Sequence, residues 1–288
     1  MLVLTVDASS PSARLDLVAT AAGQVRDSAR IAQAPGSPKL TDFLDRIPRP
    51  DTVAHRFGHD GAAPAIVDDQ VREALGAASG PARGPMPESL ELLDFLRVRL
   101  PDVPHVACPD TAYSHQWHGL SLSWAYRRGA LLLSWTGTPN LVLVHLDEDW
   151  SVCAAREGGC LNRPGAPEGP VDTEDEFLSR VRQDITEAAQ RIGRLDGLVF
   201  TGELGWGQPE MASAVCAGLP FLGLRGELST ERAHDAVISP ADSTVPVLAV
   251  RAREELQLAE IARHTVEGER QVANPKRVRL GEHGGVNH

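Results

Sequence analysis

The stretch Leu195-Asp196-Gly197-Leu198-Val199-Phe200-Thr201-Gly202-Glu203-Leu204-Gly205 joins a short apolar run to a glycine turn. A run of this length that is bounded by a turn is typical of a strand buried on both faces. The pattern predicts a helix over 173–192 before this strand. After the turn it predicts another helix, a strand over 245–251 and a final helix over 254–264. Strands that alternate with helices are typical of an α/β fold.

The same alternation extends back to the amino terminus. Helices are predicted over 89–100 and 120–135, where apolar residues recur at helical spacing. Strands are predicted over 2–7, 14–20, 24–31, 51–57, 103–108 and 140–146, and a pair of strands over 150–155 and 159–161. Both halves of the chain have strands followed by helix, strand and helix, which is the order that a duplicated fold would give.

Length and composition restrict the class of protein. A chain of 288 residues exceeds one typical core and suits two domains. The hydrophobic content of 42% and charged content of 23% are those of a soluble globular protein, and no apolar run is long enough to cross a bilayer. Since the amino terminus reads as a strand rather than a leader peptide, we expect a cytoplasmic protein.

Charge and cysteine content exclude further classes. A formal net charge of -11 disfavours a nucleic-acid partner, since binding a phosphate backbone requires basic patches. The four cysteines are irregularly spaced and form no Cys-x-x-Cys pair, so neither a zinc site nor a disulfide framework is indicated. We expect four reduced, partly buried thiols.

Several segments resemble, in the same order along the chain, the motifs of acetate kinases. The segment 195–205 is similar to the adenosine-binding loop Val-Phe-Thr-Gly-Gly-Ile-Gly-Glu-Asn, and Ala54-His55-Arg56-Phe57-Gly58-His59-Asp60-Gly61 is similar to Gly-His-Arg-x-x-His-Gly-Gly. Further similar segments are 6–12, 109–113, 117–121 and 253–259. Together they cover most of the chain, which is identified as a shortened, divergent member of the acetate kinase family.

The resemblance implies two lobes of duplicated ribonuclease-H-like fold, the actin-like ATPase (ASKHA) fold, with a cleft between them. The expected boundaries are 1–118 for an acceptor-side lobe and 119–252 for a nucleotide-side lobe. Residues 253–288 would form a helix returning to the first lobe and a flexible tail. The implied activity is ATP-dependent phosphotransfer to a small-molecule carboxylate, giving an acyl phosphate, with ATP and Mg²⁺ bound and a homodimer formed.

The resemblance also assigns catalytic roles. Arg56 would clamp the carboxylate, because a guanidinium matches a carboxylate bidentately; the alternative is an arginine paired on the surface. His118 would stabilise the transferring phosphoryl group, or be an ordinary polar turn residue. Asp110 would orient basic groups or bind the water shell of the metal, and helix capping is its alternative role. Arg163 would be the remnant of a catalytic arginine.

Binding roles follow in the same way. Ser10 and Ser12 would face the phosphates, or cap the loop that holds them. Gly202 and Gly205 would let the backbone approach adenosine, or serve only the turn. Asp7 and Glu254 would lie on the metal side, although a glutamate in the first turn of a helix also suits the helix dipole. These residues are carried over one by one, each at a position that matches a motif.

One departure from the family pattern concerns the phosphate loop. The family sequence His-Leu-Gly-Asn-Gly is replaced here by His145-Leu146-Asp147-Glu148-Asp149. Carboxylates that face a triphosphate repel it unless metal ions neutralise them. The loop is either a solvated acidic hairpin or the sign of a changed metal or substrate preference. The alternative function is therefore a catalytically degenerate homologue that binds a nucleotide or a partner protein. In the adenosine turn Trp206 could stack on a base or fill an emptied pocket.

Overall fold

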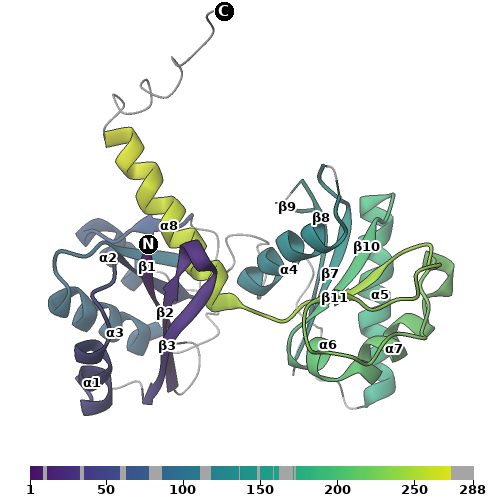
Figure 1. Ribbon diagram of the computed structural model, residues 1–288, viewed down its shortest axis with the longest axis horizontal. Coiled ribbons are helices and arrows are strands. Elements are labelled where there is room, and N and C mark those ends of the chain that lie inside the picture. The colour runs from purple at the N-terminus through teal and green to yellow at the C-terminus, as the bar shows by residue number, and fades with distance from the viewer. Residues whose placement is uncertain are drawn as a thin grey trace, which may run out of the picture. The chain divides into compact units, whose positions relative to one another are not determined.

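The computed structural model describes residues 1–8, 12–32, 36–58, 63–77, 86–110, 118–135, 137–147, 150–157, 159–161, 171 and 173–273. The chain divides into two compact units, Met1–Pro109 with Leu258–His288, and Asp110–Gln257 (Figure 1). Each unit contains one six-stranded mixed sheet with helices packed on it. The predicted α/β class is confirmed.

The sheet of the first unit has the strand order β3-β2-β1-β4-β6-β5. Its strands are β1 (Leu2–Asp7), β2 (Ser12–Ala19), β3 (Gln24–Ala32), β4 (Thr52–Phe57), β5 (Ala65–Ile66) and β6 (His105–Pro109). Strands β1, β2 and β3 form an antiparallel meander, whereas β1, β4 and β6 are parallel. The short strand β5 pairs antiparallel with β6 at the edge.

The sheet of the second unit repeats this topology. Its strands are β7 (Leu141–Leu146), β8 (Trp150–Arg156), β9 (Gly159–Cys160), β10 (Gly197–Thr201), β11 (Ala236–Val237) and β12 (Val247–Ala249). The order β9-β8-β7-β10-β12 reproduces β3-β2-β1-β4-β6, with the same meander and the same parallel pairs. The duplication expected from the order of elements is thus confirmed.

Eight α-helices are described along the chain, and two of them were not predicted. They are α1 (Pro38–Arg46), α2 (Asp69–Ala77), α3 (Met86–Arg99), α4 (Gly119–Leu132), α5 (Glu174–Ile192), α6 (Glu203–Gly207), α7 (Pro209–Ala217) and α8 (Glu254–Ala273). The unpredicted helices are α1 and α2, and α6 and α7 together occupy the place of the single helix predicted after the turn. Each has nine residues, and only Leu40 and Phe43 in α1 and Leu75 in α2 are buried, so neither shows a sustained apolar stripe.

The central strands of the second unit are buried on both faces. Val142 and Phe200 lie in one core cluster with residues of α5 and α7. Leu143 and Val199 lie in a second cluster with residues of α4. Gly129 in α4 allows close packing, because an added Cβ would come within 3.1 Å of the Val199 side chain. This two-sided burial explains why β10 reads as a continuous apolar run.

The apolar residues of α5 face the same core. Leu178, Val181 and Ile185 are buried among residues of β7, β8 and β10. The amide of Glu176 donates a hydrogen bond to the Thr173 hydroxyl at 3.2 Å, which fixes the start of the helix. The apolar face of this helix is therefore buried in the interior of the unit.

The prediction of four reduced thiols is wrong for two of the cysteines. Cys153 in β8 and Cys160 in β9 form a disulfide bond. Because the two strands pair antiparallel, their Cα atoms are 5.8 Å apart, within the usual range for a disulfide. Cys108 and Cys216 are free and buried, and burial raises the pKa of the Cys216 thiol to about 12. Among the helices that the structure describes, none is long and apolar enough to cross a membrane.

Candidate active site

In the first unit, two predicted site residues meet where parallel strands end. Asp7 is the last residue of β1, and Arg56 lies near the end of the neighbouring strand β4. Nη1 of Arg56 donates to Oδ2 of Asp7 at 3.0 Å. Only 14% of the Arg56 side chain is exposed, so Arg56 is not an arginine paired on the open surface. Ser12 begins β2, whereas Ser10 and Arg163 lie outside the described residues.

In the second unit, Asp110 organises the start of α4. Its carboxylate accepts hydrogen bonds from the backbone amides of His118 at 3.3 Å and Leu120 at 3.0 Å. Asp110 is 2% exposed, so these bonds are screened little by water. Asp110 therefore caps the start of α4 and fixes the position of His118, whereas the capping role considered at residues 111–112 lies outside the described residues.

His118 has an unusual backbone conformation. Its φ is 63°, in the left-handed region, where a residue other than glycine is uncommon. Its ring stacks on that of His145, with centroids 4.0 Å apart and planes inclined by 14°. Such local strain recurs at functional sites, where the surrounding structure holds it in place.

His145 links this histidine pair to the phosphate loop. It lies near the end of β7 and is 2% exposed. Its Nε2 lies 2.8 Å from Oδ2 of Asp147, and Oδ1 of Asp147 accepts the backbone amide of Glu203 at 2.7 Å. Burial alone would raise the pKa of Asp147, but the hydrogen bonds from His145 and from the Glu203 amide hold the pKa below its ordinary value.

The acidic phosphate loop is thus partly turned inward. The negative charge of Asp147 is directed at His145 and at the first turn of α6 rather than at solvent alone. Glu148 and Asp149 lie outside the described residues. The expected repulsion of a triphosphate therefore does not follow from Asp147, whose charge is already offset by protein donors.

Gly202 and Gly205, the two glycines predicted to lie beside adenosine, differ in whether the structure has room for a side chain at their positions. Gly202 has φ 86°, and a Cβ there would overlap the carbonyl oxygen of Leu146 and lie 2.9 Å from its carbonyl carbon. A Cβ on Gly205 would be 3.6 Å from the nearest side chains of Leu146 and Phe200, an ordinary contact. Trp206 packs against the apolar core of this unit, so its side chain fills space beside the turn.

Glu254 lies beside the first turn of α4. Its Oε1 accepts the hydroxyl of Ser121 at 2.6 Å, and Ser121 is three residues beyond His118. In the next turn of α8, the side-chain amide of Gln257 donates to the Ser123 hydroxyl at 2.9 Å. The second unit therefore places Asp110, His118 and Glu254 at the same end of α4.

Comparison with known proteins finds similarity to acetate kinases. Residues 171–260 match the model of the Acetokinase family. The acetate kinase of Symbiobacterium thermophilum is 39% identical over 99 residues, covering 34% of this chain and 24% of that protein. The acetate kinase of Nostoc punctiforme is 22% identical over 314 residues, covering 76% of this chain and 78% of that protein. In sequence, this chain is therefore similar to acetate kinases over most of its length.

A solved structure extends the likeness to the whole fold. The propionate kinase of Francisella tularensis superposes with a TM-score of 0.77, covering 91% of this chain and 99% of that one at 16% identity. At this identity the likeness establishes the fold, and the two-lobed fold expected of an acetate kinase family member is confirmed. The roles of individual residues rest on the geometry above.

The sequence placed His145 and Asp147 in the altered phosphate loop but did not predict that their side chains contact one another. One signal could have done so, because residues two apart on a strand point to the same face. His145 at the end of β7 and Asp147 just after it satisfy that spacing. The contact of Asp147 with Glu203, 56 positions further on, required the folded chain.

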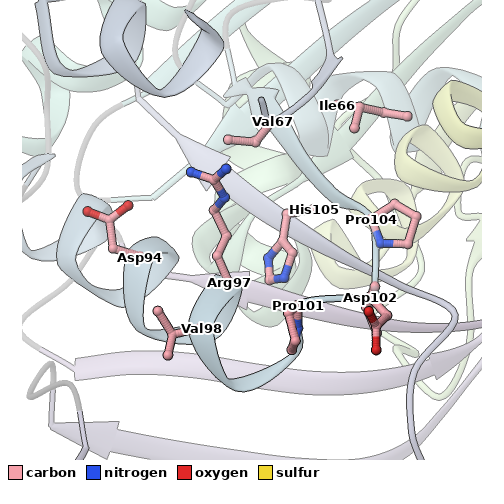
Figure 2. A pocket seen from close by; sticks show the side chains of 10 residues that line it. Ile66, Val67, Asp94, Arg97, Val98, Pro101, Asp102, Pro104 and His105 are labelled. Atoms are coloured by element: carbon pink, nitrogen blue, oxygen red, sulfur yellow. The ribbon is translucent and has the colours of Figure 1, made fainter. Parts of the chain in front are cut away.

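A pocket in the first unit contains none of the predicted site residues (Figure 2). It has a volume of about 790 Å³ and lies at the amino end of β6, whereas Arg56 and Asp7 lie at the carboxyl ends of their strands. Its lining combines apolar side chains with Arg97, Asp94, Asp102 and His105. Since its charges are of both signs, the lining does not favour one class of ligand.

His105, which lines this pocket, forms a buried pair with His55. Nε2 of His55 and Nδ1 of His105 are 3.0 Å apart. Burial lowers the pKa of His105 to about 4, and burial together with the neighbouring His105 holds the pKa of His55 well below its ordinary value. Both imidazoles are therefore neutral near pH 7.

Proposed function

We propose that this chain is an acetate kinase family member that transfers the γ-phosphoryl group of ATP to a small carboxylate and so forms an acyl phosphate. The relatives named above are acetate and propionate kinases, enzymes that act on short carboxylates by their names. The observation that carries the proposal is the cluster of His118, His145 and Asp147, with Asp110 capping the helix on which His118 begins. It supports a site for a phosphoryl group that carries negative charge.

The reaction needs little covalent chemistry from the protein. A carboxylate oxygen attacks the γ-phosphorus, an oxygen–phosphorus bond forms, and the bond to the oxygen bridging to the β-phosphorus breaks. No proton has to move in this step, so catalysis consists of positioning and of stabilising charge on the phosphoryl oxygens. Groups that donate hydrogen bonds to those oxygens therefore determine the rate.

In this proposal Arg56 binds the carboxylate group of the acceptor. Its guanidinium is a planar donor that matches a carboxylate, and the ion pair with Asp7 at 3.0 Å restricts where it points. We assign stabilisation of the phosphoryl oxygens to His118, which the Asp110 cap and the stacked His145 ring hold in place. Preorganised donors of this kind cost no rearrangement when charge develops.

Asp7 in the first unit and Glu254 in the second are each a candidate ligand of Mg²⁺, because hard cations prefer carboxylate oxygens. Each carboxylate now accepts a hydrogen bond, from Arg56 and Ser121 respectively. Within the part of the chain that the structure describes, no three His, Cys, Asp or Glu side chains form a metal site. Mg²⁺ in phosphotransferases is commonly held by one or two carboxylates together with the phosphates of the substrate. When bound, Mg²⁺ neutralises charge on those phosphates.

The test is direct detection of the product. The purified protein is incubated with MgATP and, one at a time, acetate, propionate, butyrate and larger acids. Acyl phosphate is trapped with hydroxylamine while ADP release is followed in the same sample. Carboxylate-dependent ADP release with matching hydroxamate supports the proposal. Nucleotide binding without product from any acid would favour the degenerate homologue instead. Light scattering on the same preparation tests the expected homodimer.

A further inference from the structure

Asp147 makes two contacts that fix the chemistry of His145. Its carboxylate is ionised near neutral pH, because its pKa is lowered, and it therefore only accepts hydrogen bonds. One oxygen already takes the Glu203 amide, and the other faces Nε2 of His145 at 2.8 Å. Nε2 must consequently carry a proton. In the neutral imidazole, Nδ1 is then the nitrogen with the lone pair.

Nδ1 of His145 is buried and has no hydrogen-bond partner among the described residues. A buried polar atom in this state costs free energy unless something satisfies it. The stacked ring of His118 does not do so, since parallel rings contact through their faces and ring nitrogens bond at the edge. The titratable side chains that contact His145 among the described residues are Asp147, at Nε2, and His118, whose ring stacks on its face.

We propose that His145 and Asp147 form a proton-linked contact for a phosphate oxygen of the nucleotide. When that oxygen approaches Nδ1, His145 takes up one proton from solution at Nδ1 and donates this N–H to the phosphate. The imidazolium then lies between two anions, the phosphate at Nδ1 and Asp147 at Nε2. Asp147 is thus a positioning residue, which acts on the substrate through His145.

This inference rests on the proposed function in one respect, the choice of a nucleoside triphosphate as the ligand. It also gives a role to an acidic residue in the phosphate loop. A carboxylate that faced the phosphates would repel them, whereas one behind an imidazole strengthens the imidazole as a cationic donor. The alternative ligand group at Nδ1, a hydroxyl or water that donates to the lone pair, would bind without proton uptake.

The experiment is calorimetric titration of the protein with MgATP at pH 7.5, in two buffers of different ionisation enthalpy. The difference in heat gives the protons taken up per nucleotide. We expect an uptake approaching one proton in the wild-type protein and close to none in Asp147→Asn. Loss of one charge-assisted hydrogen bond should also weaken MgATP binding on the order of tenfold or more. Glu203→Gln is the matched control: it removes a carboxylate from the same turn but keeps the amide, and should retain the uptake.

MgATP binding by the wild-type protein without proton uptake would overturn the inference, and so would the same uptake in Asp147→Asn. If MgATP does not bind at all, both the proposed function and the phosphate contact fail. Nitrogen NMR of the free protein then still tests the positioning step. The wild-type His145 should be protonated at Nε2, and this preference should weaken in Asp147→Ala. An unchanged tautomer in that variant would refute the role of Asp147 independently of any nucleotide.

Discussion

Replacing Gly202 by alanine tests the turn between β10 and α6. Gly202 has φ 86° and ψ 171°, a backbone conformation that is essentially restricted to glycine. The new Cβ would also overlap the carbonyl oxygen of Leu146. Because that oxygen belongs to the backbone of β7, a side-chain rotation cannot relieve the clash.

The expected cost follows from these two terms. Holding a residue other than glycine in this conformation costs about 1–3 kcal/mol. Forcing an extra methyl group into a packed region costs about 1–3 kcal/mol more. We therefore expect Gly202→Ala to lower the free energy of unfolding of the second unit by roughly 2–6 kcal/mol. Phosphotransfer should fall with it, because Leu146 lies between His145 and Asp147.

Urea unfolding followed by tryptophan fluorescence measures this effect in the correct unit. All five tryptophans, at positions 117, 124, 135, 150 and 206, lie between residues 110 and 257. Gly205→Ala is the matched control: its Cβ has room, and alanine within a helix is favoured over glycine by about 0.5–1 kcal/mol. If Gly202→Ala is as stable as Gly205→Ala, the account of this turn is wrong.

Three further predictions concern other parts of the chain. Arg56→Ala should reduce acyl phosphate formation by on the order of a hundredfold or more. Arg49→Ala, which removes an exposed ion pair, is the control and should keep the wild-type rate. An equal loss of rate in both variants would contradict the role of Arg56. Because the pKa of His105 is about 4 in the folded protein and 6.5 is its ordinary value, the unfolded state binds more protons between these pH values. Stability should therefore fall by about 3 kcal/mol as the pH drops from 6.5 to 4, and a double variant with leucine at His55 and His105 should lose less over the same pH range. Thiol titration in denaturant should find two reactive cysteines without reductant and four with it, and four in both cases would exclude the disulfide.

The fold could be predicted because its signals are local and repeated. The buried run of β10 and the matching order of elements in both halves indicated a duplicated α/β protein. The short helices α1 and α2 were not predicted, because few of their residues are buried and the apolar pattern is correspondingly weak. The helix predicted to reach residue 135 ends at Leu132, and Ser134 beyond it adopts φ 50°. Element boundaries depend on such single conformations, which apolar spacing does not encode.

The candidate site was less predictable because its contacts join distant positions. Arg56 and Asp7 were each proposed, but their ion pair depends on the parallel pairing of β1 and β4. Asp110 was assigned both a catalytic and a capping role, and only the structure shows the caps on His118 and Leu120. The disulfide likewise follows from strand pairing, since cysteine spacing alone did not indicate it.

The central claim is that this chain makes an acyl phosphate from ATP and a carboxylate. The most direct test is hydroxamate formation with MgATP and a series of short carboxylic acids, in the wild-type protein and in His118→Ala. The account predicts a carboxylate-dependent product that requires MgATP, and a decrease of on the order of a hundredfold or more in the variant. No product with any acid, or an equal yield from His118→Ala, would contradict it.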